Sequence, residues 1–424
     1  MKLFNKLIKL NPLASIASNG ILSDIDYYID TGSYALNMLL SGSIYKGFPG
    51  NRIVGFAGPT SAGKTYLTIS ILKNYQKMAD NNYVICYDTE GRLTKDKLQD
   101  AGIVIDRYLH APIRNLEQFK TEIIQGLSIV KVEVGFGDQT NKKDVEEMDP
   151  AKLLEDEKQL EKKQEDAPRD NYFFVLDSLS QAGSDKEETD AIKGDVKADM
   201  GARARTIKSI FRNITMDLNI LKYPMIVTSH VYNPMNQYQP NVIAGGTGLQ
   251  YAAAIIIECL PTKDSVTDGK GNRHTIGTKI RCVLRKSELT KQWKSVPIKV
   301  NFANGLDRYS GLFEVCLENN IIVKDKTKYT FPDGNKYFMK DILETPEQVF
   351  TKASLDIIDV ELGKIFTYGK NTEINTEEED KNKIVEQINQ EMKVKVGSPE
   401  DEIVNIPNVH ELLGKSGEVS ESEE

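Results

Sequence analysis

Gly58-Pro59-Thr60-Ser61-Ala62-Gly63-Lys64-Thr65 is the stretch that decides the fold of this chain of 424 residues. It follows a short apolar run, Arg52 to Ala57, that is typical of a buried strand, and it precedes a helical pattern through Ile69, Leu72 and Tyr75. The glycines let backbone N–H groups curl around phosphate oxygens, and the N-terminus of the following helix adds a favourable dipole. The spacing Gly-x-x-x-x-Gly-Lys-Thr between a strand and a helix therefore predicts a loop that binds the phosphates of a nucleotide.

Two side chains of this loop have a defined task. Lys64 is expected to reach the β- and γ-phosphates, and the Thr65 hydroxyl is expected to ligate Mg²⁺. The expected nucleotide-binding set is the loop with the residue that follows it: Gly58, Pro59, Thr60, Ser61, Ala62, Gly63, Lys64, Thr65 and Tyr66.

Carboxylates end two other apolar runs. Asp177 follows Phe173 to Leu176 and is the candidate for a second Mg²⁺ contact, although an ordinary strand end capped by Asp has the same pattern. Glu90 comes three residues after the run Val84 to Tyr87. It is the candidate for polarising a water in line with the γ-phosphate. A solvated loop glutamate is the alternative interpretation.

His230 and a later group of glycines are further candidates. His230 ends the apolar run Met225–Ser229, at the sheet edge where ligands bind in open α/β folds, although a lone histidine is more often a satisfied structural residue. The loop after it ends in Gly245-Gly246-Thr247-Gly248 and is a candidate for an ATP-gated element. Glycine-rich turns between strands are also common, so the pattern alone does not decide.

A basic stripe is expected on the helix predicted from Met200 to Leu221. Arg205, Lys208 and Arg212 fall at positions i, i+3 and i+7 and share one face, whereas Arg203 points elsewhere. The stripe fits contacts to the phosphate backbone of a nucleic acid, and it also fits an ordinary solvated helix face.

Strand-like and helical segments alternate along the first half of the chain. Strands are expected at 52–57, 83–88, 172–177 and 224–229, and helices at 95–101, 115–132 and 200–221. This alternation predicts an α/β fold with a mostly parallel, doubly wound sheet. Later strand-like segments at 252–260, 278–284 and 296–302 are joined by short turns, which predicts that antiparallel strands extend the sheet. A small α+β module is expected after them, with a helix in 309–320 and a hairpin turn at 332–335.

Charge is spread unevenly along the chain. The net charge is −8, but residues 371–424 carry 15 acidic and 5 basic residues, a net of −10 that leaves +2 on residues 1–370. Residues 138–170 form a second acidic stretch, which is read as an exposed insertion. A mildly basic body with two acidic appendages is compatible with a polyanionic ligand. We expect an N-terminal arm at 1–30, a nucleotide-binding core at 31–308, a small module at 309–370 and an acidic, disordered tail at 371–424.

Composition excludes several classes of protein. With 40% hydrophobic and 27% charged residues the chain is not fully disordered, and no stretch approaches the ~18 apolar residues of a membrane span. Lysines interrupt the apolar residues of Met1 to Leu10, unlike in a signal peptide. The four cysteines lie far apart, and none forms a Cys-x-x-Cys pair. We expect a soluble, cytoplasmic protein with reduced thiols and no membrane partner.

Taken together, these motifs resemble the RecA-type recombinases, and most closely the UvsX recombinases of tailed phages. The resemblance runs from about Ile29 to Leu362. Its motifs follow one another in the family's order: the lead-in Asp30-Thr31-Gly32-Ser33, the Walker A sequence Gly58–Thr65, the strand end Asp88–Glu90, the Walker B run Val175–Leu179, the exit Asp199–Arg205 from a first DNA-binding loop, the pair Ser229-His230, the end Gly245–Gly248 of a second DNA-binding loop, and Tyr309–Leu312.

The resemblance implies a RecA-like P-loop ATPase core and a DNA-dependent ATPase. Such a protein forms a helical homofilament on single-stranded DNA, uses ATP and Mg²⁺, and exchanges strands with homologous duplex DNA in recombination, repair and recombination-dependent replication. ATP would lie between neighbouring subunits, and the N-terminal helix would dock on the next one. A single-strand-binding protein and a loading factor are the other expected partners, and the host-cell cytoplasm is the expected location.

The resemblance also assigns tasks to single residues. It gives water activation to Glu90, the coupling of the γ-phosphate to DNA to His230, and contacts with the neighbour's ATP to Arg285 and Lys286. The DNA-binding candidates are Met200, Arg205, Lys208, Arg212, Gly245 and Gly246.

Two other functions stay open at this point. A RecA-fold motor such as a helicase is one, although it would need a separate remodelling domain for which we see no room outside the core. A mediator that binds ATP as a switch without useful turnover is the other, and the set Lys64, Thr65, Glu90 and Asp177 argues against it.

Overall fold

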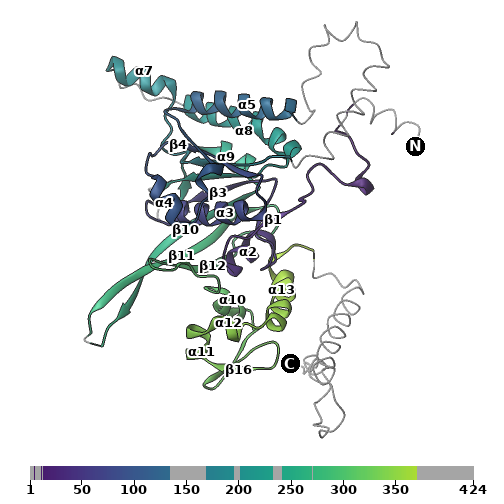
Figure 1. Ribbon diagram of the computed structural model, residues 1–424, viewed down its shortest axis with the longest axis vertical. Coiled ribbons are helices and arrows are strands. Elements are labelled where there is room, and N and C mark those ends of the chain that lie inside the picture. Colours follow the sequence, from purple (N-terminus) through teal and green to yellow (C-terminus); the bar gives the residue numbers. More distant parts are fainter. Residues whose placement is uncertain are drawn as a thin grey trace, which may run out of the picture. The chain divides into compact units, whose positions relative to one another are not determined.

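The computed structural model describes residues 4, 11, 13–133, 169–194, 201–232, 241–269 and 271–369. Its centre is a nine-stranded sheet in the order β13-β12-β11-β10-β3-β7-β6-β4-β5 (Figure 1). The parallel part consists of β10 (Ile255–Thr267), β3 (Ile53–Ala57), β7 (Met225–Ser229), β6 (Asn171–Asp177), β4 (Asn82–Asp88) and β5 (Tyr108–Pro112). The antiparallel part consists of β11 (Arg273–Ser287), β12 (Ser295–Asn301) and β13 (Gly305–Leu306). The predicted parallel sheet with an antiparallel extension is confirmed.

Helices cover both faces of this sheet. α3 (Lys64–Met78) packs on one face, and α5 (Leu116–Glu133), α8 (Ala202–Leu221) and α9 (Thr247–Ala252) pack on the other (Figure 1). The buried strands are apolar on both sides because successive side chains of a strand point to opposite faces. In β6, Phe173 and Val175 belong to the α3 side, whereas Phe174 and Leu176 belong to the α8 side. This doubly wound arrangement explains why the strands read as continuous apolar runs in the sequence.

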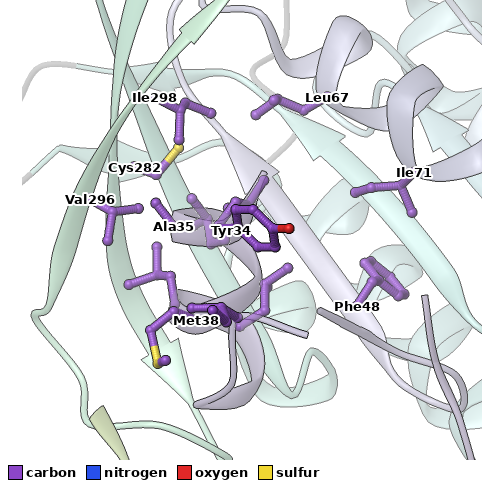
Figure 2. Close-up of a cluster of buried hydrophobic side chains, with 14 of the residues drawn as sticks. Tyr34, Ala35, Met38, Phe48, Leu67, Ile71, Cys282, Val296 and Ile298 are labelled. Atoms are coloured by element: carbon purple, nitrogen blue, oxygen red, sulfur yellow. The ribbon is translucent and has the colours of Figure 1, made fainter. Parts of the chain in front are cut away.

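The antiparallel part shares one core with the parallel part. α2 (Tyr34–Ser41) starts at Ser33, whose side chain accepts a hydrogen bond from the backbone N–H of Leu36, and it buries nearly its whole length. Figure 2 shows side chains of α2, α3, β2 (Phe48–Pro49), β11 and β12 meeting in this core. β1 (Tyr28–Ile29) pairs with β2 beside them. Because these elements bury apolar side chains against each other, the two parts of the sheet are held as one body.

A small module follows the sheet. Its strands β14 (Val323–Asp325), β15 (Lys328–Thr330) and β16 (Lys336–Phe338) form a three-stranded sheet. Its helices are α10 (Leu312–Glu318), α11 (Met339–Glu344), α12 (Pro346–Val349) and α13 (Lys352–Phe366). The predicted turn at 332–335 joins β15 to β16, and the backbone N–H of Phe331 donates to the Asn335 carbonyl at 2.8 Å. Asp359 of α13 accepts from the backbone N–H of Ile44 at 2.6 Å, so the module is tied to the segment after α2.

The hairpin of β10 and β11 is longer than the sequence predicted. The two strands pair from Ile255 with Ser287 out to Thr267 with Arg273, and they project from the sheet (Figure 1). Beyond the last pair, the backbone N–H of Asp268 donates to the Asn272 carbonyl at 2.9 Å. Most of the hairpin's outer residues are polar and exposed, so they lack the apolar pattern on which the prediction rested. The predicted strand at 252–260 also begins later, because 247–252 form α9.

Other elements match or supplement the prediction. α4 (Lys95–Asp100) lies where a helix was expected. The edge strand β5 was not predicted, because it is short and mostly exposed. α7 (Asp185–Lys193) begins at a capping box formed by Ser184 and Glu187. β8 (Val231–Tyr232) pairs with β9 (Val242–Ile243).

Three predictions of local structure fall largely outside the described residues: the N-terminal helix, the insertion at 138–170 and the tail at 371–424. Within the described part of the chain, no helix combines the length and the apolar character needed to span a membrane.

Candidate nucleotide-binding site

The carboxyl ends of β3, β4, β6 and β7 meet at one edge of the sheet, because these strands are parallel neighbours. A cleft of about 270 Å³ lies at this edge. Its lining residues are Thr60, Ser61, Ala62, Gly63, Lys64, Thr65, Tyr66, Asp88, Glu90, Arg92, Leu93, Asp177 and His230. The structure thus brings together most of the predicted nucleotide-binding set with Glu90, Asp177 and His230.

The loop between β3 and α3 needs glycine at both ends. Gly63 has a φ of +82°, and a Cβ there would lie 2.5 Å from Ile280 Cδ1 of β11. Gly58 has no unusual φ, but a Cβ there would lie 2.6 Å from the Cys259 carbonyl oxygen of β10. The first glycine is therefore required by lack of space, and the second by both space and backbone conformation.

Lys64 is buried beneath the loop. Its Nζ donates hydrogen bonds to the carbonyl oxygens of Gly58 and Pro59, both at 2.9 Å. Burial lowers the pKa of Lys64, and the charge of Arg92 acts in the same direction, whereas nearby Asp177 and Glu90 oppose the shift. An ammonium group with partly satisfied donors in such a loop is suited to bind phosphate oxygens.

Asp177 and Thr65 form the candidate metal site. Thr65 Oγ1 donates to Asp177 Oδ2 at 3.0 Å, and Thr228 Oγ1 donates to Asp177 Oδ1. Burial raises the pKa of Asp177, and the two hydroxyl donors partly oppose that effect. Mg²⁺ prefers hard oxygen ligands and commonly takes one or two protein groups together with phosphates and water. Thr65 and Asp177 fit this ion. Among the described residues, no group of three or more His, Cys, Asp or Glu side chains is placed to hold a metal by itself.

Glu90 lines the same cleft as Lys64. Its Oε1 accepts a hydrogen bond from Ser178 Oγ at 3.0 Å and lies 3.4 Å from His230 Nε2. Its Oε2 lies 3.3 Å from a guanidinium nitrogen of Arg92. The carboxylate is mostly buried, with 12% of the side chain exposed. A fixed carboxylate at this place has the chemistry of a general base.

Asp88 fixes the loop that carries Glu90. Its Oδ1 accepts the backbone N–H groups of Glu90 and Gly91, both at 2.8 Å. Its Oδ2 lies 2.9 Å from Nε2 of His110, the central residue of β5. Because Asp88 accepts two successive backbone N–H groups, it fixes the backbone from which the Glu90 side chain extends.

Arg285 and Lys286 do not line the cleft. Arg285 donates to Glu258 Oε2 at 2.6 Å, and its guanidinium lies over the Trp293 ring at 5.2 Å. The other oxygen of Glu258 accepts from Asn241 Nδ2 at 2.6 Å. Lys286 Nζ donates to the Gln250 carbonyl at 2.9 Å. Within one subunit these two cations therefore have partners of their own, and their assignment to a neighbour's ATP stays a prediction.

Three of the DNA-binding candidates lie on α8. Arg205, Lys208 and Arg212 are exposed, whereas Arg203 turns back and donates to the carbonyl oxygens of Leu179, Ser180 and Ala182.

The two glycines of this candidate set lie against the same part of the molecule. A Cβ on Gly246 would lie 3.4 Å from Ala204 Cβ, and one on Gly245 would lie 2.8 Å from Leu179 Cδ2. Met200 falls outside the described residues. His230 connects this region to the cleft, because its carbonyl accepts the backbone N–H of Ala244 at 2.9 Å.

Sequence reasoning missed three contributors to the cleft. Arg92 had no assigned task, although it lies only two residues after Glu90. Ser178 follows Asp177 directly, yet a serine beside a strand end carries no signal of its own. The support of Asp88 by His110 depends on β5, the strand that was not predicted.

Comparison with known proteins agrees with the resemblance seen in the sequence. No family model matches the chain. It is 26% identical over 291 residues to the Recombination and repair protein of Enterobacteria phage T4, which covers 69% of this chain and 63% of that protein. It is 26% identical over 307 residues to Protein RecA of Streptomyces coelicolor, covering 72% and 68%. It is 25% identical over 328 residues to Protein RecA of Clavibacter michiganensis, covering 75% and 76%.

The aligned part of the chain spans 63% of the length of the phage relative. The order of motifs, the parallel sheet with its antiparallel extension and these similarities together identify the chain as a homologue of the RecA-type recombinases.

Proposed function

We propose that the chain is an ATP-dependent DNA recombinase, a DNA-dependent ATPase that assembles on single-stranded DNA and exchanges strands with a homologous duplex. The observation that carries this proposal is the convergence of Lys64, Thr65, Asp177, Glu90 and His230 on one cleft. A mediator that only binds nucleotide needs phosphate contacts, but it has no use for a second carboxylate, Glu90, that is held in the cleft by Ser178 and Arg92.

The positions of these residues support ATP hydrolysis by the following division of tasks. Lys64 binds the β- and γ-phosphates once it exchanges its contacts with the Gly58 and Pro59 carbonyls for phosphate oxygens. Thr65 and Asp177 would hold Mg²⁺, which would neutralise phosphate charge. Glu90 orients the attacking water and accepts its proton, and Ser178 keeps the carboxylate in place through the bond to Oε1.

DNA dependence is assigned to His230. The imidazole lies next to Glu90. The His230 carbonyl accepts a hydrogen bond from the backbone N–H of Ala244, the residue directly before Gly245 and Gly246. DNA bound by this glycine segment and by the stripe on α8 shifts His230 and with it the hydrogen bonds around Glu90. The recombinase works as a helical homofilament with ATP between subunits, where Arg285 and Lys286 reach the neighbour's nucleotide, and a single-strand-binding protein and a loading factor assist assembly.

The test combines ATP turnover with filament assembly. Wild-type protein is expected to hydrolyse ATP faster when single-stranded DNA is added and to form filaments on it that electron microscopy detects. Lys64→Ala is expected to lose both, because it removes the charge that meets the phosphates. Lys77→Ala serves as the control, since this exposed lysine lies on the same helix but not in the cleft. Normal turnover in Lys64→Ala, or hydrolysis that ignores DNA, would contradict the proposal.

A further inference from the structure

Arg92 is a cation at the mouth of the cleft for which the reaction described so far has no use. It lies on the segment between β4 and α4, and 65% of its side chain is exposed. One guanidinium nitrogen lies 3.3 Å from Glu90 Oε2. The side chain lines the same cleft as Lys64 and Asp177, so it faces the space that the phosphates must enter.

Lys64 and Arg92 differ in how they are held. Lys64 is 7% exposed and is hydrogen-bonded to two carbonyls of the loop, so its position is fixed by the backbone. Arg92 is held at its tip by one carboxylate at 3.3 Å, and because 65% of the Arg92 side chain is exposed, water screens this half-exposed pair and weakens it. Since rearranging such a weak pair costs little, Arg92 is able to exchange Glu90 for a stronger anionic partner.

We propose that Arg92 contacts the terminal phosphate of bound ATP from within the same subunit, and that it thereby distinguishes ATP from ADP. This inference rests on the proposed function. A guanidinium presents a planar fork of donors that matches the oxygens of a phosphate group. The terminal phosphate carries more negative charge than the carboxylate that Arg92 contacts in the structure, so it attracts the guanidinium more strongly.

The exchange has a consequence for Glu90. While Arg92 lies 3.3 Å from Oε2, its guanidinium occupies the oxygen that would otherwise face a water in the cleft. When the guanidinium moves to the phosphate, Oε2 is released toward the attacking water, whereas Oε1 keeps its bond from Ser178. ATP binding therefore prepares its own general base, and ADP, which lacks the terminal phosphate, leaves Arg92 on Glu90.

The experiment compares two nucleotides on the full chain. Dissociation constants are measured for ADP and for a non-hydrolysable ATP analogue with an imido bridge, using wild type, Arg92→Ala, Arg92→Lys and the control Lys95→Ala. Lys95 is an exposed cation three residues away that does not line the cleft. Arg92→Ala is expected to weaken binding of the analogue by about tenfold or more, the usual effect of losing a hydrogen bond to a charged group, and to change ADP binding by less than about twofold. Arg92→Lys is expected to fall between, because an ammonium keeps the charge but not the fork.

Two results would overturn the inference. One is an equal change, or no change, in the affinities for the two nucleotides. The other is a loss of turnover in Arg92→Ala while the affinity for the analogue is unchanged, since Arg92 would then act only by holding Glu90. Lys64→Ala separates these results from a failure of the proposed function: if it binds both nucleotides normally, the cleft is not the nucleotide site at all.

Discussion

Thr65 Oγ1 donates a hydrogen bond to Asp177 Oδ2 at 3.0 Å, across 112 residues of sequence. Thr228 donates to the other oxygen, so two neutral hydroxyls support a buried carboxylate. The pKa of Asp177 is raised chiefly by burial, which means that folding disfavours its charged form. The site therefore carries a cost in the absence of a cation, and this cost can be measured.

Asp177→Asn is expected to raise the melting temperature of the protein without nucleotide or Mg²⁺. The amide keeps the shape, and the Thr65 hydroxyl can turn to accept from the new NH₂ group, so that the hydrogen bonds survive while the buried charge is removed. Because the pKa is raised, the difference should be greatest at neutral pH and shrink as the pH falls toward the ordinary value of 3.8. Asp100→Asn, at an exposed position, is the control for which no such gain is expected. A lower melting temperature for Asp177→Asn at neutral pH would refute this account.

Glu90→Gln should separate binding from chemistry. Glutamine keeps an oxygen for Ser178 and the approximate shape of the side chain, but it cannot accept a proton from water. We expect ATP affinity close to that of wild type and turnover reduced by about a hundredfold or more, with long-lived assemblies on DNA. Hydrolysis within a few-fold of wild type would mean that the general base is another residue.

The basic stripe on α8 can be tested by its salt dependence. If Arg205 and Arg212 each contact one phosphate of a single strand, the double alanine variant should reduce the slope of log K against log salt concentration by about 0.7 per contact. The control removes two exposed cations on the opposite side of the sheet, in Lys77→Ala, Lys95→Ala. Binding is measured by fluorescence anisotropy with labelled DNA. An unchanged slope for the α8 variant would show that the stripe is an ordinary solvated helix face.

The pair of Glu258 and Arg285 should contribute strongly to stability. Their side chains are 5% and 17% exposed, and Glu258→Ala leaves a mostly buried guanidinium without its carboxylate. The expected loss in the free energy of unfolding is about 3–5 kcal/mol, measured by urea denaturation. Asp325→Ala breaks a pair with Lys336 whose side chains are about half exposed, and it should cost no more than about 1 kcal/mol. Equal losses in the two variants would show that burial does not govern this pair.

Most of the sheet was predictable because its central strands are buried on both faces. The runs that became β3, β4, β6 and β7 lie within about two residues of their predicted bounds, and their carboxyl ends carry Asp177, Glu90 and His230 to one edge. The topology of parallel strands then places these side chains together without knowledge of any contact.

The parts that escaped prediction depend on contacts between distant residues. β5 has an ordinary exposed sequence and is a strand only because β4 offers it a free edge. The outer half of the β10–β11 hairpin is polar, and its register is fixed by pairing along the ribbon. The position of Arg92 beside Glu90 depends on the course of a loop, and Arg285 is directed to Glu258 by a strand pairing with a bulge between Ile256 and Ile257. No local pattern of residue types encodes such contacts.

The crowding of Gly58 by Cys259 and of Gly63 by Ile280 has a mechanical consequence. The phosphate loop is wedged against β10 and β11, so it also serves as the joint between the parallel and antiparallel parts of the sheet. The space available to the phosphate loop is therefore set in part by Cys259 and Ile280, two residues of the long hairpin that lie some two hundred positions later in the chain.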